Sequence, residues 1–188
     1  MDASLMQIDK MSNKRIVLSS KFLRAWIHES ALEDDFNYLR GLCTENSIDD
    51  LWCRQLLQAP TMMHICLAYS GLHTRVLSNI SERMNITEEQ IKSSLRLDKN
   101  KISNIESPSP ISDNERIIKL CCLIGRARLI VEESGIVEEF NAAAWVGSWL
   151  YSSCPALAGE QPAHLLSTLE GIGYLTLNVE IMQSGAYF

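Results

Sequence analysis

Apolar side chains recur along this chain with the 3.6-residue spacing of helices, whereas the alternating apolar and polar positions typical of strands are scarce. Helix-start signals accompany the spacing. Ser30–Glu33, Thr87–Gln90 and Ser112–Glu115 each have the form of a capping box, in which two side chains satisfy free amides at a helix N-terminus. We therefore predict an all-α fold.

The expected helices end at residues that disfavour helical backbone, among them Gly41, Pro60, Gly71, Gly135 and Gly185. Pro162 suits the first turn of a helix because its missing amide would have no partner there. The expected apolar faces are, in chain order, Leu32, Phe36 and Leu39; Ile48, Trp52 and Leu56; Met62 to Tyr69; Val76, Ile80 and Met84; Ile117, Leu120, Ile124, Ala127 and Val131; Phe140, Ala144, Trp145 and Trp149; Ile172, Leu175, Val179 and Met182.

A Ser-Pro-Ser-Pro run at 107–110 marks the clearest joint, because closely spaced prolines interrupt a helix. Before it, 75–105 has the pattern of helix, tight turn and helix expected of a helix-turn-helix module. We expect four segments. These are an N-terminal extension (1–60, disordered at first and then helical), a helix-turn-helix domain (61–106), a linker with a connecting helix (107–129) and a small helical domain (130–188).

The net charge of −6 is unevenly distributed. Residues 75–105 hold six Lys or Arg against four Asp or Glu and are the only basic segment, while 106–188 holds four against ten. If 98–105 is a recognition helix, its outward residues are suited to base edges and phosphates. The candidate DNA contacts are Lys92, Arg96, Lys99, Asn100, Lys101 and Asn104. The same residue types are common on solvated helices, so an ordinary surface remains the alternative.

Several classes of protein are disfavoured by what the sequence lacks. No apolar run approaches a membrane span, and the acidic N-terminus has no secretory signal pattern, so we expect a cytoplasmic protein. The six cysteines lack CxxC spacing, and we expect reduced, mostly buried thiols with no metal site. Without a glycine-rich phosphate loop or a GxSxG turn, we expect neither an enzyme nor a bound cofactor.

The C-terminal third resembles a known family. Trp149-Leu150, Pro155 to Gly159, Pro162, Leu165 to Thr168 and Gly171, followed by a closing helix, are similar to the toxin-binding domain of Xre/MbcA/ParS antitoxins. The stretch from Glu115 to Ala127 resembles the family's connecting helix, and 75–105 occupies the place of its Xre-type helix-turn-helix. The chain departs from the pattern at Ser153-Cys154, where Pro-Asn is usual, and at Ala158, which replaces the first glycine of a pair.

The resemblance implies the antitoxin of a bacterial type II toxin-antitoxin system. It implies as partner a RES-domain toxin that consumes NAD or ADP-ribosylates proteins, obstructed by the antitoxin's C-terminus. It also implies that the helix-turn-helix represses the operon by binding operator DNA, and we expect a homodimer that forms a hetero-oligomer with the toxin. The matching toxin-binding positions, on the exposed side of the last helix and in the tail, are Asn178, Met182, Gln183, Ser184, Gly185, Ala186, Tyr187 and Phe188.

Physical chemistry supports this interpretation and leaves alternatives. An acidic domain is attracted to the cationic pocket that a pyrophosphate requires, and Tyr187 and Phe188 have the rigid aromatic character of interface anchors. Both aromatics are equally compatible with a frayed terminus or with packing on the protein's own surface. The alternative function is a DNA-binding transcriptional regulator, or an interaction module, of the same fold without a toxin partner. A third possibility is an antitoxin that has lost DNA binding.

Overall fold

The computed structural model describes residues 21–44, 48–72, 75–98, 110–135 and 140–183, and these residues form helices and turns without a strand. The all-α prediction is therefore confirmed. In chain order the elements are α1 (Lys21–Glu29), α2 (Glu33–Thr44), α3 (Asp50–Gln58), α4 (Thr61–Ser70), α5 (Arg75–Arg83), α6 (Glu88–Ser94), α8 (Ile111–Glu133), α9 (Ala142–Leu150), the 3₁₀ helices η2 (Pro155–Leu157) and η3 (Pro162–Ser167), and α10 (Leu169–Gln183).

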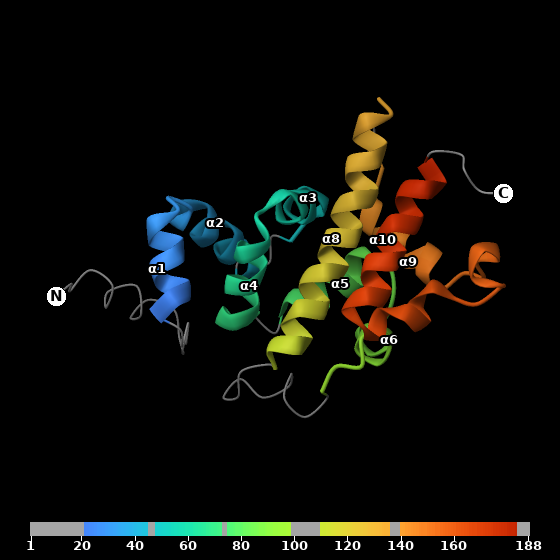
Figure 1. Ribbon diagram of the computed structural model, residues 1–188. Coiled ribbons are helices and arrows are strands. Elements are labelled where there is room, and N and C mark those ends of the chain that lie inside the picture. Colours follow the sequence, from blue (N-terminus) through green and yellow to red (C-terminus); the bar gives the residue numbers. More distant parts are fainter. Residues whose placement is uncertain (1–20, 45–47, 73–74, 99–109, 136–139, 184–188) are drawn as a thin grey trace.

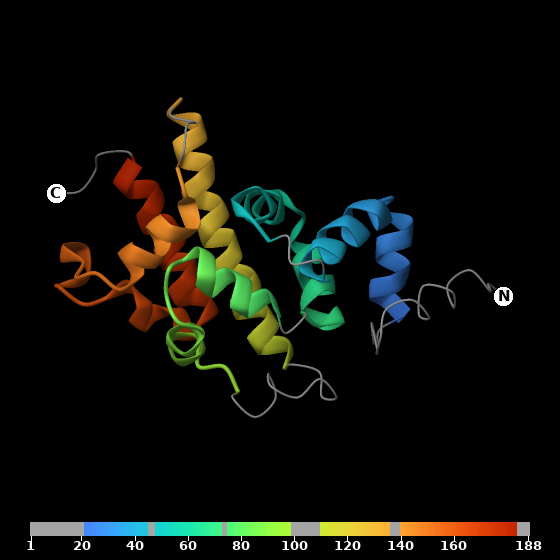
Figure 2. The ribbon, with the colours of Figure 1, turned by 180° about the vertical axis from the view of Figure 1, so that it is seen from behind.

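The long helix α8 lies at the centre of the molecule (Figure 1). It packs against α3 and α4 on one side and against α9, η3 and α10 on the other. Helices α1 and α2 lie beyond α4 at one end, and α5 and α6 cover the back, as Figure 2 shows. Because Leu120, Leu123 and Ile124 of α8 are completely buried, this helix joins the two halves of one apolar core. The expected segment boundaries stay predictions.

Two glycines allow the helices to cross closely. A Cβ atom on Gly125 of α8 would lie 2.2 Å from the backbone oxygen of Cys53 in α3. A Cβ atom on Gly147 of α9 would lie 2.1 Å from the backbone oxygen of Met84, just after α5. Real Cβ atoms do not come this close to backbone atoms, so both crossings require glycine.

Buried polar side chains link elements that are distant in sequence. Asp50, at the start of α3, accepts a hydrogen bond from the backbone N–H of Ala142 at 2.7 Å and pairs with Arg83 at 3.3 Å. It therefore joins α3 to the start of α9 and the end of α5. The Trp52 indole donates to the backbone oxygen of Leu39 at 3.0 Å and links α3 to α2. Such satisfied groups fix the relative placement of the helices, because leaving them unpaired would be costly.

Several helix ends agree with the sequence analysis. Thr87 and Gln90 form both hydrogen bonds of the predicted capping box. The helix after Pro60 ends at Gly71, and α8 ends just before Gly135; both glycines have positive φ. Pro162 begins η3 as expected, although the element is a 3₁₀ helix.

Two predicted capping boxes are wrong, and so is one predicted helix end. The Ser30 hydroxyl donates to the backbone oxygen of Ile27, so it closes α1 while α2 begins only at Glu33. Ser112 lies inside α8, which already begins at Ile111. Gly41 lies within α2, which continues to Thr44. Sequence-local signals misplaced these boundaries because turns and packing decide them.

No helix among the described residues is long and apolar enough to cross a membrane. Five cysteines, Cys53, Cys66, Cys121, Cys122 and Cys154, are free and buried, as expected for reduced thiols. Burial raises the pKa of the Cys122 thiol to about 12, so this group stays protonated and unreactive near neutral pH. Within the described ranges, no three His, Cys, Asp or Glu side chains gather as metal ligands would.

Candidate partner-binding and nucleic-acid surfaces

The closing helix α10 presents apolar residues on two faces. Ile172, Leu175 and Val179 are buried and form the face that packs on the rest of the protein, chiefly on α8. On the other face, Tyr174 is 47% exposed and Leu177 is 50% exposed. We call this surface, made of Gly173, Tyr174 and Leu177, the α10 outer face. An aromatic and a leucine exposed side by side on a well-packed helix mark a candidate contact surface.

Asn178 does not lie on that outer face, so the expected exposure of this residue is wrong. Its side chain is only 7% exposed, and its amide donates to the backbone oxygen of Tyr174 at 2.8 Å. Residues three or four apart lie on the same face of a helix. Asn178 is three residues after the buried Leu175 and next to the buried Val179, so it lies on the inner face of α10. Met182 is half-buried.

The other predicted toxin-binding positions are not placed by the structure. Gln183 is the last residue of α10, and its side chain lies outside the described part of the chain. Ser184, Gly185, Ala186, Tyr187 and Phe188 also lie outside the described residues. The aromatic anchors expected in the tail therefore stay predictions.

Sequence reasoning missed Tyr174 and Leu177, although a signal was present. The segment 169–182 carries apolar residues on every side of a helical projection, and a solvent-facing helix usually has a polar side. An all-round apolar helix at the edge of a protein indicates a second contact.

The start of α10 is fixed by a close backbone approach. The Thr168 hydroxyl accepts a hydrogen bond from the N–H of Gly171 at 3.0 Å. A Cβ on Gly171 would lie 2.0 Å from the backbone oxygen of Leu165, so this close approach requires glycine. Gly173 has no neighbouring atom within 4 Å and leaves open space on the outer face.

An ion pair joins α8 to α10, and a stack of aromatic rings lies on α9. Arg126 of α8 pairs with Glu180 at 2.8 Å and aligns the two helices. On α9, the rings of Trp145 and Trp149 stack with centroids 5.9 Å apart, and Phe140 lies against Trp145 at 6.4 Å. Trp149 packs against the core as expected, but Trp145 is 37% exposed, so its expected core position is wrong.

The described part of the candidate helix-turn-helix comprises α5, α6 and the turn to Asp98. The Lys92 ammonium pairs with Glu88 at 2.7 Å and with Glu89 at 3.6 Å, and the hydrogen bond that it donates to Glu88 is the main cause of its raised pKa. This lysine is fully charged but already neutralised within its own helix. Arg96 is exposed and occupies the turn in a left-handed conformation with φ of +50°. Lys99, Asn100, Lys101 and Asn104 lie outside the described residues.

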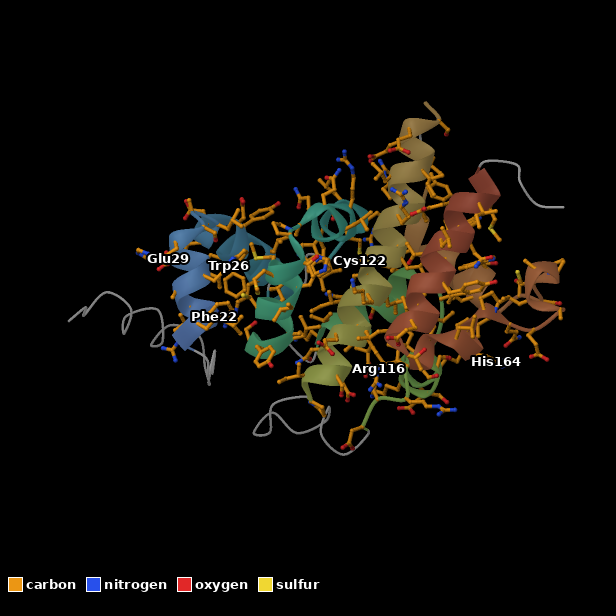
Figure 3. All side chains as sticks on the ribbon, viewed as in Figure 1. Phe22, Trp26, Glu29, Arg116, Cys122 and His164 are labelled. Carbon is orange, nitrogen blue, oxygen red and sulfur yellow. The ribbon has the colours of Figure 1, made fainter. Side chains whose placement is uncertain are left out.

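Helix α8 holds this turn in place. The carboxylate of Asp113, only 3% exposed, accepts a hydrogen bond from the backbone N–H of Asp98 at 3.0 Å. The guanidinium of Arg116 donates to Asp113 and, at 3.5 Å, to the backbone oxygen of Arg96. Figure 3 shows Arg116 at the end of α8 nearest α6. Asp113 thus stabilises the turn after α6, which explains why it is buried inside the first turn of α8.

Comparisons with known proteins give one informative similarity. No family model matches the chain, and no solved structure matches it. The chain is similar to a protein of Sphingobium sp. (strain YBL2) described as a "Prs ADP-ribosylating antitoxin". The two are 39% identical over 88 residues, which are 47% of this chain and 55% of the relative. The chain therefore spans about half the length of the curated relative it matches. The relative's description agrees with the antitoxin expectation, while the Xre/MbcA/ParS type stays a prediction.

Proposed function

We propose that this protein is the antitoxin of a toxin-antitoxin pair and that it binds and blocks a toxin with ADP-ribosylating or NAD-consuming activity, of the RES-domain class. The similarity to a protein named as an antitoxin supports this function. The sequence offers no catalytic motif, which is consistent with the non-catalytic member of such a pair. Both members of the pair act in the cytoplasm.

The α10 outer face carries the proposal. Tyr174 and Leu177 remain half-exposed although α10 is firmly packed through its inner stripe, and Gly173 lets a partner approach the helix backbone. Aromatic side chains that are rigid and partly exposed are typical binding anchors. Residues 184–188 follow α10 directly in the sequence, and in the proposed mode one partner contacts both the α10 outer face and this tail. The six excess negative charges of 106–188 attract a cationic nucleotide pocket.

A matched pair of variants tests this surface. Leu177 on α10 and Leu51 on α3 are 50% and 49% exposed, so Leu177→Asp and Leu51→Asp introduce the same charge at equally open positions. The readout is cellular NAD in bacteria that co-express the protein with the toxin encoded by the neighbouring gene. We expect L177D to lose protection and L51D to retain it. Equal protection by both variants, with equal expression, would remove the α10 outer face from the mechanism.

The tail is tested separately. Deletion of 185–188 is expected to leave the unfolding temperature unchanged and to abolish protection, because the C-terminus obstructs the toxin's NAD pocket. If the truncated protein still binds the toxin in co-purification but no longer protects NAD, then the α10 outer face provides binding and the tail provides occlusion. Full protection by the truncated protein would contradict occlusion by the tail.

We further propose that the protein represses its own operon as a homodimer that binds operator DNA through 75–105. The support is the attachment of the turn after α6 to α8, through hydrogen bonds to the backbone of Arg96 and Asp98. Two modules of a dimer would bind successive major grooves about 34 Å apart. A regulator without a toxin partner is the second candidate, favoured by the same geometry. Gel shifts with the upstream DNA test both, and binding that does not weaken with salt would contradict phosphate contacts.

A further inference from the structure

A polar hollow of about 480 Å³ lies between α6, the end of α9 and η3. It joins the candidate helix-turn-helix to the segment that precedes α10, two regions more than 50 residues apart in sequence. The lining side chains are Gln90, Ser93, Ser94, Arg96, Tyr151, Gln161, Ala163, His164 and Ser167. Figure 3 shows His164 on η3, at the end of the molecule opposite to α1.

The chemistry of the lining suits an anion. It contains hydroxyl, amide, guanidinium and imidazole groups and no carboxylate, although the chain as a whole carries a charge of −6. Among the described residues, no carboxylate pairs with the Arg96 guanidinium. One lining residue, His164, pairs with a carboxylate outside the lining, that of Glu160, at 3.1 Å. Hydrogen-bond donors around an arginine are the usual environment of a bound phosphate.

The walls of the hollow are already held in place. The Tyr151 and Ser94 hydroxyls are 3.0 Å apart and join α9 to α6. The Gln161 amide donates to the backbone oxygen of Tyr151 at 2.9 Å and fixes the start of η3. Because these bonds are made between protein groups, the site requires little rearrangement to bind a ligand.

Arg96 provides a second indication, because its backbone is in an unfavourable conformation. Its φ of +50° is the left-handed region that favours glycine, yet an arginine stands there. The Leu97 N–H donates to the Lys92 oxygen at 3.0 Å and closes this turn at the end of α6, and the Arg116 guanidinium donates to the Arg96 backbone oxygen at 3.5 Å. Strain at an exposed, otherwise unpaired cation that faces a hollow is typical of a functional position.

We propose that this hollow binds a phosphate group, with Arg96 as the charged contact and with Ser93, Ser167 and His164 as further donors. The phosphate belongs either to a free nucleotide or to a nucleic-acid backbone, and both present the same chemistry. In the second case the site extends the proposed DNA contact beyond 75–105 to η3, and it then rests on the proposed DNA binding. Toxin neutralisation is measured by cellular NAD and phosphate binding by titration, so the phosphate site and the proposed toxin binding can each fail without the other.

The experiment uses the full-length protein and three probes, namely inorganic phosphate, ADP and a duplex of the upstream DNA. Arg96→Gly removes the guanidinium and also relieves the left-handed strain, so it is expected to unfold at the same or a higher temperature than the parent. Ser167→Ala removes a donor from the η3 side. Arg24→Gln, an exposed position on α1 at the other end of the molecule, is the matched control for lost charge. Calorimetric titration measures binding at low salt.

We expect R96G to weaken binding about tenfold, S167A to weaken it less, and R24Q to leave it unchanged, as loss of a charged hydrogen bond predicts. Weakened ADP or phosphate binding identifies a free nucleotide or phosphate as the ligand. Weakened duplex binding alone identifies the nucleic-acid backbone. If none of the probes binds, or if R96G and R24Q behave alike with every probe, the proposal is overturned. If R96G unfolds at a lower temperature than the parent, the binding of the three probes by S167A and His164→Gln is compared with that by R24Q instead. Binding that is no weaker in these two variants than in R24Q then overturns the proposal.

Discussion

The crossing of α3 and α8 makes a sharp stability prediction at Gly125. A methyl group there would lie 2.2 Å, 2.5 Å and 2.8 Å from the Cys53 oxygen, the Cys53 carbonyl carbon and the Arg54 nitrogen. All three are backbone atoms, so no side-chain rotation relieves the overlap and the helices must separate. Gly173 on α10 is the matched control, because a methyl group there meets no atom within 4 Å.

The two substitutions are expected to have opposite signs. In a helix interior, alanine is more favourable than glycine by about 0.5–1 kcal/mol. Gly173→Ala should therefore gain up to that amount. For Gly125→Ala the same gain opposes an overpacking cost of about 3 kcal/mol, at the upper end of the usual range because the contacts are to backbone. The expected net loss for G125A is about 2 kcal/mol.

Urea and thermal unfolding followed by circular dichroism measure the difference. For a chain of this length, about 1 kcal/mol corresponds to a shift of roughly 2–4 °C. G125A should therefore unfold about 4–8 °C below the parent, and G173A at or slightly above it. If G125A is as stable as G173A, then α3 and α8 do not cross at this distance and the central packing described above is wrong.

Three further substitutions test individual contacts. Asp50→Ala should lower the free energy of unfolding by about 2–3 kcal/mol, since it leaves the Ala142 N–H and Arg83 without their buried acceptor. The control variant Asp49→Ala removes only the N-cap of α3 and should lower it by about 1 kcal/mol. Equal losses of the two variants in urea unfolding would contradict the link that Asp50 makes between α3, α5 and α9. Ala158→Gly should raise the unfolding temperature by about 2 °C, because Ala158 has φ of +55°, and a lower temperature would refute the strain at this turn. The Nε2 atom of His64 lies 2.7 Å from the Leu56 oxygen, while its Nδ1 atom is buried without a partner. Burial lowers the pKa of His64 in the folded protein. As the pH falls below about 6.5, the imidazole of the unfolded chain therefore takes up a proton before that of the folded protein does. As the pH is lowered through this range, the free energy of unfolding should therefore fall faster for the parent than for His64→Gln. Parallel pH profiles of the two proteins would contradict this.

The sequence alone predicts the helices but not their packing. Two predicted apolar stripes are buried as expected, because 3.6-residue spacing depends only on local sequence. They are Val76, Ile80 and Met84 of α5 and the residue after it, and Ile172, Leu175 and Val179 of α10. The central position of α8 does not follow from such spacing. Its Gly125 is unremarkable in the sequence, and its role emerges only where Cys53 approaches it in three dimensions.

The candidate surfaces were predicted in part. The segment that carries them was identified, but Asn178 proved buried while Tyr174 and Leu177 are exposed, since a small error in helical phase exchanges neighbouring faces. Asp113 lies within the predicted capping box 112–115 without a role of its own, whereas in the structure it stabilises the backbone turn after α6. Arg96 was predicted as a phosphate contact from its charge, and its left-handed backbone and the surrounding hollow needed the structure.

The most direct test of the account is a crystal structure of this protein bound to the toxin that we propose as its partner. The measurement is the exposed fraction of Tyr174 and Leu177, now 47% and 50%. We predict that both side chains become buried against the toxin, with the chain's last residues in the toxin's nucleotide pocket. A complex in which both remain as exposed as they are in the free protein would contradict the proposed mode of neutralisation.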